Sequence, residues 1–294
     1  MDRQKITLFS NDFSDFPIGP FPYDPEHSAM GEYHYYPVKG YTGQWYDPIT
    51  NSNYRGPSWM VTEDDGKKYM EQMRVLTPGK HVSCPTLAAG DKDWEDYTVS
   101  VRMRSLYTGE PAGVLFRYQT SLMHYAFVLC NKKAMLYLVE KEKRELLGEA
   151  DFDFDCDTFY ELRVDVKGSL IRCYINNELL IETRNSRYTY GSIAIAAYMP
   201  AQFTDVNVFC DEEEYRHYIV KKQAREKRVA EKRLRYPQPK LLKIIDLRDF
   251  GAGRQIRFGH LTGTDEWFFV MAQHQKRVYK DRYANISCLT AVSL

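Results

Sequence analysis

The feature that most constrains this chain is a two-residue alternation of side-chain character that recurs in short segments between residues 94 and 210. Apolar side chains occupy the odd positions from Tyr97 to Met103, and polar or basic ones occupy the even positions. The segment YELRVDVKG, residues 160–168, repeats the pattern with its apolar side chains on even positions. Because successive side chains of a strand point to opposite faces, each segment predicts a strand with one buried face.

Several further short segments continue this rhythm and predict an antiparallel β-sandwich. One of them, LIRCYINNELLIET, reads as a hairpin that turns at Asn176 and Asn177, since asparagine tolerates the positive φ of tight hairpin turns. The others are GVLFRYQ, YAFVLCN, AMLYLVEK, GSIAIAAYM and FTDVNVFC. Short strands at regular spacing with turn residues between them are typical of two packed antiparallel sheets.

The segments before and after this region differ in character. The first sixty residues are rich in Pro, Gly, Tyr and Trp and predict an ordered covering segment. Glu212 to Arg235 contains no Gly or Pro and predicts a mostly polar helix that ends before YPQPK. Short strands follow to the end of the chain. We therefore expect a sandwich over 1–211, a charged linker helix over 212–240 and further strands over 241–294.

Charge and composition exclude some classes of function. The 40 basic and 40 acidic residues balance, which argues against a general nucleic-acid binder. Nine basic and two acidic residues between Arg216 and Arg235 favour a solvated helix lying against an acidic neighbour, with binding to nucleic acid or an anionic surface as the alternative. No apolar run reaches the length of a signal peptide or of a membrane span, so we expect a cytoplasmic chain without a membrane partner. The six cysteines show no zinc-ligand spacing.

The order of the strand segments resembles the concanavalin A-like lectin/glucanase sandwiches, in the laminin G-like branch attached to carbohydrate-active enzymes. The residues that carry the resemblance are LFSNDFSD, WEDYTVSVRMR, AGVLFRYQTSLMHYAFVL, FYELRVDVKGSLIRCYINNELLIE, YGSIAIAAY and AQFTDVNVF. The resemblance implies a jelly roll of two curved antiparallel sheets whose concave face often receives sugar.

The tail resembles the opening of an FG-GAP-like β-propeller, as in rhamnogalacturonan lyase-like proteins. The carrying residues are RFGHLTGTDEWFFVMAQ and ISCLTAVSL. A propeller needs at least four blades of four strands, so we expect an incomplete blade and a truncated chain. Asp265 is the only aspartate in GHLTGTDE, where the family often has an Asp-rich calcium turn, and calcium needs about six to eight oxygen ligands. This turn is therefore a poor metal loop.

The sandwich resemblance also implies sugar-binding residues. Arg117, Tyr118, Tyr125 and Tyr198 match positions near the concave face of the resembled family. Arginine can bind hydroxyls or a uronate carboxylate, and tyrosine can stack on a sugar ring. Alternation puts Arg117 and Tyr118 on opposite faces unless a bulge intervenes. The alternative is that Arg117 makes an internal salt bridge and the tyrosines belong to the core. Further candidate platforms are Trp45, Tyr46 and Trp59.

A structural calcium ion is the one cofactor that the resemblance implies. Asp12 and Asp205 lie on segments near the two ends of the sandwich sequence, and the first and last strands are neighbours in the resembled fold. Carboxylate and backbone oxygens suit calcium. The alternative for each aspartate is an ordinary turn.

Catalysis by this chain alone is not expected. Glucanases of this fold use a Glu-x-Asp-x-x-Glu arrangement, which the sequence lacks. The segment DFDFDCD, residues 151–157, is read as a solvated edge or turn, with a calcium site and catalysis as weaker alternatives. His260 and His274 could serve as base or acid in a propeller-type lyase, but an exposed strand or loop position is the simpler reading.

We therefore expect a non-catalytic, glycan-binding jelly roll belonging to a polysaccharide-degrading parent. The parent would be a lyase that acts on rhamnogalacturonan or other uronate-containing glycans. Two alternatives remain: a structural or oligomerisation scaffold with no ligand, and a glycoside hydrolase of the sandwich fold.

Overall fold

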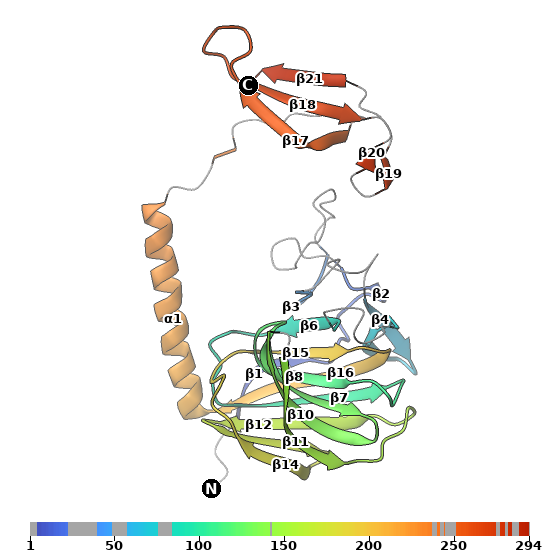
Figure 1. Ribbon diagram of the computed structural model, residues 1–294. Helices are drawn as coiled ribbons and strands as arrows, with labels where there is room; N and C mark the ends of the chain where they lie inside the picture. Colours follow the sequence, from blue (N-terminus) through green and yellow to red (C-terminus); the bar gives the residue numbers. More distant parts are fainter. Residues whose placement is uncertain are drawn as a thin grey trace. The chain divides into compact units, whose positions relative to one another are not determined.

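A computed structural model describes residues 5–22, 40–48, 58–75, 84–141, 143–236, 240–241, 244, 251–274, 277–279, 282–283 and 288–293. The chain divides into two compact units, Met1–Arg228 and Val229–Leu294. The first unit holds two antiparallel sheets and most of the helix, and the second holds the remaining strands (Figure 1). The predicted all-β sandwich is confirmed.

Nine described strands form the first sheet of the sandwich. They are β1 (Lys5–Asn11), β2 (Gly19–Pro20), β4 (Trp59–Asp64), β5 (Lys67–Gln72), β7 (Tyr97–Ser105), β12 (Tyr160–Lys167), β13 (Leu170–Ile175), β14 (Glu178–Arg184) and β16 (Ala201–Asp211). Their order is β14-β13-β12-β7-β16-β5-β4-β2, with β1 paired to β16 beside this path. The first and last strands of the sandwich are therefore neighbours, as the resemblance implied.

Seven described strands form the second sheet. They are β3 (Trp45–Tyr46), β6 (Thr86–Ala89), β8 (Ala112–Thr120), β9 (Met123–Cys130), β10 (Lys133–Glu140), β11 (Lys143–Asp151) and β15 (Ser192–Ala197). Their order is β11-β10-β9-β8-β15-β6-β3. The core lies between the two sheets. Val99 and Val101 enter it from β7, and Phe116 and Phe127 enter it from the second sheet. Their burial follows from the alternation, which sends every second side chain inward.

A bulge in β8 separates Phe116 from Tyr118. Arg117 has a φ of 44°, in the left-handed region, and the pairing of β8 shifts its register here against both β9 and β15. Gly191 lies against this bulge with a φ of 145°, and a Cβ added to it would lie 2.3 Å from the carbonyl carbon of Arg117. The bulge thus depends on a glycine contributed by another part of the chain.

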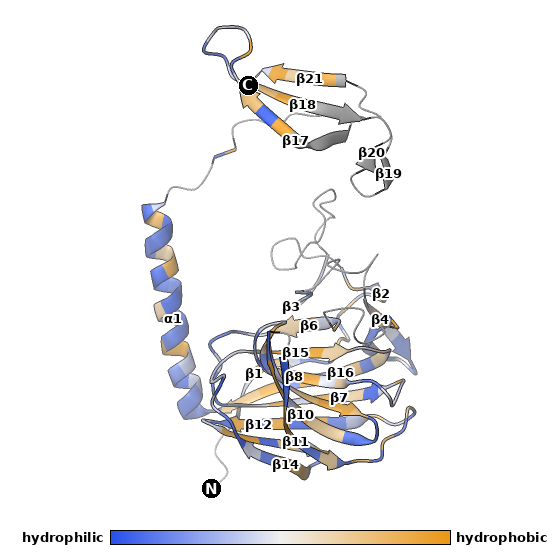
Figure 2. Cartoon of the chain, in the orientation of Figure 1, coloured by the Kyte–Doolittle hydropathy of each residue, from blue (hydrophilic) through white to orange (hydrophobic). Residues whose placement is uncertain are grey.

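The predicted helix is present as α1 (Glu212–Arg235). Asp211 caps it, since its Oδ1 accepts a hydrogen bond from the backbone N–H of Glu214 at 2.9 Å. Figure 2 shows α1 as mostly hydrophilic, but its first half packs on the sandwich. There the ring of Tyr218 is buried in an edge contact with Trp94. The compact division at Arg228 therefore falls inside the helix, whereas the boundaries proposed at 211 and 240 remain predictions.

The second unit contains a three-stranded antiparallel sheet in the order β17-β18-β21 and a two-stranded ribbon. Its strands are β17 (Gly251–Gly259), β18 (Phe268–His274), β19 (Arg277–Tyr279), β20 (Arg282–Tyr283) and β21 (Cys288–Ser293). A loop over 260–267, which contains HLTGTDE, joins β17 to β18. Phe258 is 68% exposed and Leu289 is 74% exposed. The strands are confirmed, and their membership of a propeller remains a prediction.

Candidate functional site

The outer face of the seven-stranded sheet carries a second apolar cluster, separate from the core between the sheets. It contains Leu115 from β8, Val128 from β9 and the small side chains of Ala88, Ala194 and Ala196. Half-buried Tyr46, Met135, Tyr137 and Cys84 pack against it. The outer face of the nine-stranded sheet is instead charged, with Arg102, Arg104, Glu161, Arg163 and Asp165. An apolar outer face is the unusual feature, because a solvated face of an antiparallel sheet is normally polar.

Polar and aromatic side chains border this outer-face cluster. The guanidinium of Arg144 on β11 lies 5.2 Å from the ring centroid of Tyr198 and donates a hydrogen bond to its hydroxyl. The rings of Tyr118 and His124 lie 5.6 Å apart. Burial lowers the pKa of His124 to about 4, so this ring is neutral at pH 7. Its Nδ1 then donates to the carbonyl oxygen of Thr120 at 3.1 Å.

Two groups on this face have unused binding capacity. Arg144 forms no ion pair with any carboxylate in the described residues. The hydroxyl of Tyr118 is buried and has no hydrogen-bond partner among the described residues. Burial raises the pKa of Tyr118 and the neighbouring Asp47 carboxylate raises it further, so the hydroxyl stays protonated. A buried hydroxyl without a partner is energetically costly, so a ligand or water that reached it would gain a strong contact.

The four predicted sugar-binding residues separate into two pairs. Arg117 is 0% exposed and binds the carboxylate of Asp96 at 3.3 Å and the carbonyl oxygen of Tyr188 at 3.0 Å. This is the internal salt bridge considered as its alternative. Tyr125 lies in the core between the sheets and donates to Asn185 at 2.6 Å. Only Tyr118 and Tyr198 belong to the outer face, and they are 1% and 6% exposed.

The platforms predicted near the start of the chain also separate. Trp45 and Trp59 are both buried in the core, which leaves no ring face for a sugar. Tyr46 is half-buried beside the outer-face cluster. Sequence reasoning missed His124, Tyr137 and Arg144. A correct strand register could have found them, because Val139 pairs with both His124 and Arg144 across neighbouring strands.

The predicted metal pair lies in one pocket of about 420 Å³ at the seam between β1 and β16. Asp12 and Asp205 line it together with Ser10, Asn11, Ser14, Asp15 and Asn207. Oδ2 of Asp205 is 2.7 Å from the Lys67 ammonium and 3.6 Å from the Arg102 guanidinium. Hydrogen bonds from Ser14 to the Asp12 carboxylate lower the pKa of Asp12. Since cations already neutralise Asp205, this donor set does not fit a resident calcium ion.

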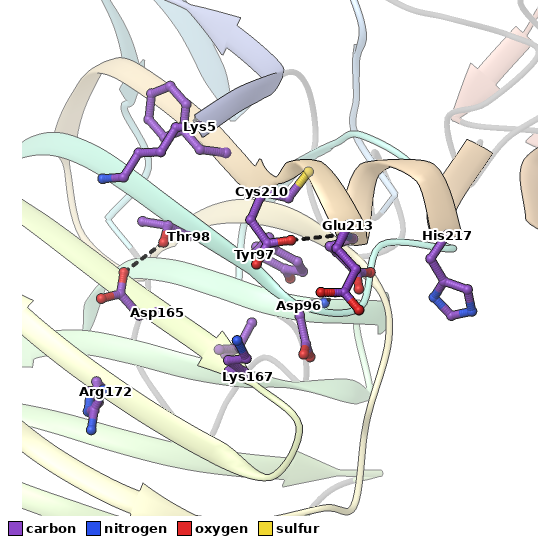
Figure 3. A pocket seen from close by; sticks show the side chains of 14 residues that line it. Lys5, Asp96, Tyr97, Thr98, Asp165, Lys167, Arg172, Cys210, Glu213 and His217 are labelled. Carbon is purple, nitrogen blue, oxygen red and sulfur yellow. Dashed lines mark hydrogen bonds between the residues drawn. The ribbon is translucent and has the colours of Figure 1, made fainter. Parts of the chain in front are cut away.

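A second groove, of about 640 Å³, lies where the start of α1 meets the sandwich (Figure 3). Asp96, Glu213 and His217 line one end, and Lys5, Asp165 and Arg172 line the other (Figure 3). Potential ligand atoms of Glu95, Glu214 and His217 lie within 4.8 Å of one another, the one such grouping among the described residues. The ammonium of Lys221 already binds the Glu95 carboxylate. We therefore interpret this cluster as part of the helix contact.

The remaining catalytic candidates occupy ordinary structural positions. Asp155 in DFDFDCD accepts hydrogen bonds from the backbone N–H groups of Asp157 and Thr158 at 2.8 and 2.7 Å, which forms a solvated turn. His260 is exposed, and its ring centroid lies 4.3 Å from that of Trp267. The side chain of His274 lies outside the described residues. No described helix is long and apolar enough to cross a bilayer.

The chain matches no protein-family profile, and no curated protein matches it in sequence. Solved structures similar to it include the carbohydrate-binding module CBM66 from Bacillus subtilis, with 15% identity and a TM-score of 0.41 over 51% of this chain and 94% of that one. The GH43 protein BlXynB from Bacillus licheniformis shows 15% identity and a TM-score of 0.39, over 58% of this chain and 40% of that one. Alginate lyase AlgAT5 from polysaccharide lyase family 7 shows 12% identity and a TM-score of 0.39, over 55% of this chain and 86% of that one.

Proposed function

We propose that the sandwich binds an oligo- or polysaccharide on the outer face of the seven-stranded sheet. The observation that carries the proposal is Arg144, which lies over Tyr198 with no carboxylate partner in the described chain. It borders a face of aromatic and small side chains. Such a face suits sugars, since aromatic rings pack on their C–H groups while a few polar groups fix their hydroxyls.

The hydroxyl of Tyr118 supplies a second polar contact in this proposal. Because no described residue hydrogen-bonds to it, a sugar hydroxyl that reached it would satisfy a buried group rather than displace a bond seen in the described chain. Neutral His124 beside it can hydrogen-bond without adding charge. Tyr137, which is half-buried, provides the ring surface that a sugar would cover. Binding thus combines one cation with neutral polar and aromatic groups.

The finer proposal is that the saccharide contains uronate residues. Arg144 rather than buried Arg117 would pair with the carboxylate, because a guanidinium binds carboxylates in a bidentate way. The proposed parent is a lyase that removes the proton beside that carboxylate and expels the glycosidic oxygen. The outer face would hold the chain of sugars and leave the chemistry to other parts of such a parent. On this proposal, the sandwich alone releases no reducing sugar.

A structural scaffold is the second candidate, and one observation favours it. Tyr118 and Tyr198 are almost fully buried, so the outer face is partly filled by its own side chains. A scaffold predicts that no glycan binds at any accessible concentration. It also predicts that changes on this face alter only stability.

Affinity gel electrophoresis and a glycan array with the full chain test the proposal. The variants are Arg144→Gln and Tyr137→Ala. The control is Arg172→Gln, because Arg172 and its partner Glu182 both lie on the nine-stranded sheet, away from the proposed binding face. We expect wild type and the control to bind and the two outer-face variants to lose about tenfold or more in affinity. If the protein bound polygalacturonate and a neutral galactan equally well, the proposed preference for uronate would be wrong, but the proposed glycan binding would stand. Absence of binding to every glycan would favour the scaffold.

A further inference from the structure

Two neighbouring lysines of β5 contact the oxygen-rich seam between the first and last strands of the sandwich. The ammonium of Lys67 binds Oδ2 of Asp205 at 2.7 Å. Asp205 has a φ of 50°, where the pairing of β16 with β7 shifts its register between Thr204 and Asn207. This irregularity is part of a seam that joins β16 to β1, and Lys67 supplies positive charge at it.

Lys68 binds the other half of the same seam. Its ammonium donates hydrogen bonds to the carbonyl oxygens of Ser14 at 2.9 Å and Phe16 at 2.7 Å. These carbonyls belong to the turn that follows β1, in which Phe13 has a φ of 63° and both Phe13 and Phe16 are buried. Lys68 therefore ties the turn to β5 through backbone oxygens, the kind of ligand that calcium also takes from loops.

We infer that Lys67 and Lys68 replace a structural calcium ion at this seam, so that the sandwich is stable without one. Their ammonium groups bind one carboxylate and two carbonyl oxygens. Asp12 already accepts two hydrogen bonds from Ser14, and its own carbonyl oxygen accepts one from Thr204 at 3.4 Å. Because the Lys67 ammonium lies 2.7 Å from Oδ2 of Asp205, a divalent ion bound to this carboxylate would be repelled by the lysine's positive charge.

The seam also keeps the residues that a metal would need if a lysine were removed. Asp12, Asp15 and Asp205 line the same 420 Å³ pocket, together with Asn11 and Asn207. Replacing Lys67 by methionine keeps most of the apolar stem and removes the nearer of the two cations at Asp205, leaving the Arg102 guanidinium at 3.6 Å. The pocket would then hold three carboxylates without this cation, which is a donor set of the type that calcium binds. We therefore expect the Lys67→Met protein to bind calcium and to gain thermal stability from it, unlike the wild type.

The test measures thermal unfolding of the full chain by tryptophan fluorescence, in EDTA and in excess calcium chloride. The variants are Lys67→Met and Lys68→Met. Lys133→Met is the matched control, since Lys133 pairs with Glu149 at 2.7 Å and is 37% exposed, close to the 39% of Lys67. We expect one Tm for wild type in both buffers, and losses of about 2–4 °C in both test variants beyond that of the control. Calcium should raise the Tm of Lys67→Met.

Two results would overturn the inference. One is a wild-type Tm that rises with calcium and falls with EDTA, or calcium-binding heat from wild type in titration calorimetry. The other is a Tm loss in Lys67→Met and Lys68→Met no larger than that of Lys133→Met. If magnesium raised the Tm of Lys67→Met as much as calcium does, the lysines would still stabilise the seam, but calcium would be rejected as the ion that they replace.

Discussion

Arg225 of α1 holds Asp91 in a paired contact, with Nη1 to Oδ1 and Nη2 to Oδ2 both at 2.7 Å. Asp91 lies just after β6, so the contact attaches the helix to the sandwich. The same guanidinium also lies 2.6 Å from the carboxylate of Asp93. The acidic neighbour expected for the basic helix is thus a specific set of carboxylates between β6 and β7, which Arg225 contacts just past the middle of α1.

Replacing Arg225 by alanine should loosen α1 without unfolding the sandwich. The expected loss is about 1 kcal/mol, toward the low end for a charged hydrogen-bonded pair because the Arg225 side chain is 37% exposed. Hydrogen exchange of the amides around Tyr218 should quicken, while exchange in β7 and β12 should not. Arg216→Ala is the control, since its pair with Glu212 lies on the helix surface. Equal exchange in both variants would contradict this role.

Replacing Glu214 by glutamine should stabilise the protein at neutral pH. Burial raises the pKa of Glu214, and the charges of Asp96 and Glu95 raise it further. A carboxyl with a raised folded-state pKa favours the folded state below its ordinary value of 4.5, and this contribution is lost as pH rises through the folded value. Urea unfolding of wild type and Glu214→Gln should therefore differ at pH 7 and converge near pH 4. A difference that is independent of pH would exclude this titration.

The contribution of Asp91 to stability should depend on pH in the opposite direction to that of Glu214, at the contact between α1 and the sandwich. Burial alone would raise the pKa of Asp91, but the hydrogen bonds from Arg225 lower it below 3.8. Its stabilising effect is complete above that ordinary value and is lost as pH falls through the lowered one. Hydrogen exchange in the first half of α1 should thus quicken as pH falls below about 4, once corrected for intrinsic rates. Arg225→Ala should lack this acid-side transition, and its persistence would assign it to another group.

The strands could be predicted because their signal is local. Alternation from Tyr97 to Met103 decides which side chains face the core, whatever the partner strand is. The neighbouring positions of Asp12 and Asp205 could also be anticipated, since β1 pairs with β16 in the order that the resemblance implies. The lysines that approach them come from β5, and nothing in the local sequence of either aspartate predicts that contact.

The outer face was harder to predict because its members meet through strand order. Arg144 lies on β11 and Tyr198 directly follows β15; the two residues are 54 positions apart in sequence, and the two strands are not adjacent in the sheet. Arg117 illustrates a second difficulty. Simple alternation treats it as one more strand residue, but a bulge that depends on Gly191 turns its side chain toward Asp96 and Tyr188. Bulges of this kind depend on the neighbouring strand and leave little trace in their own segment.

Replacing Gly191 by alanine should be among the more damaging single-methyl changes in the sandwich. A Cβ there would lie 2.3 Å from the carbonyl carbon of Arg117 and 2.7 Å from the backbone nitrogen of Tyr118, and backbone cannot move aside as a flexible side chain can. We expect a loss of about 2–4 kcal/mol in urea unfolding, from backbone strain and displacement of the bulge. Gly168→Ala is the matched control, because Gly168 also has positive φ but nothing lies within 4 Å of its added Cβ. It should lose only about 1 kcal/mol, the conformational cost alone. Equal losses of unfolding free energy in Gly191→Ala and Gly168→Ala would show that the close approach to Arg117 has little energetic effect. Since the bulge places Tyr118 on the outer face, the Gly191→Ala protein should also bind glycan more weakly under conditions where it is still folded.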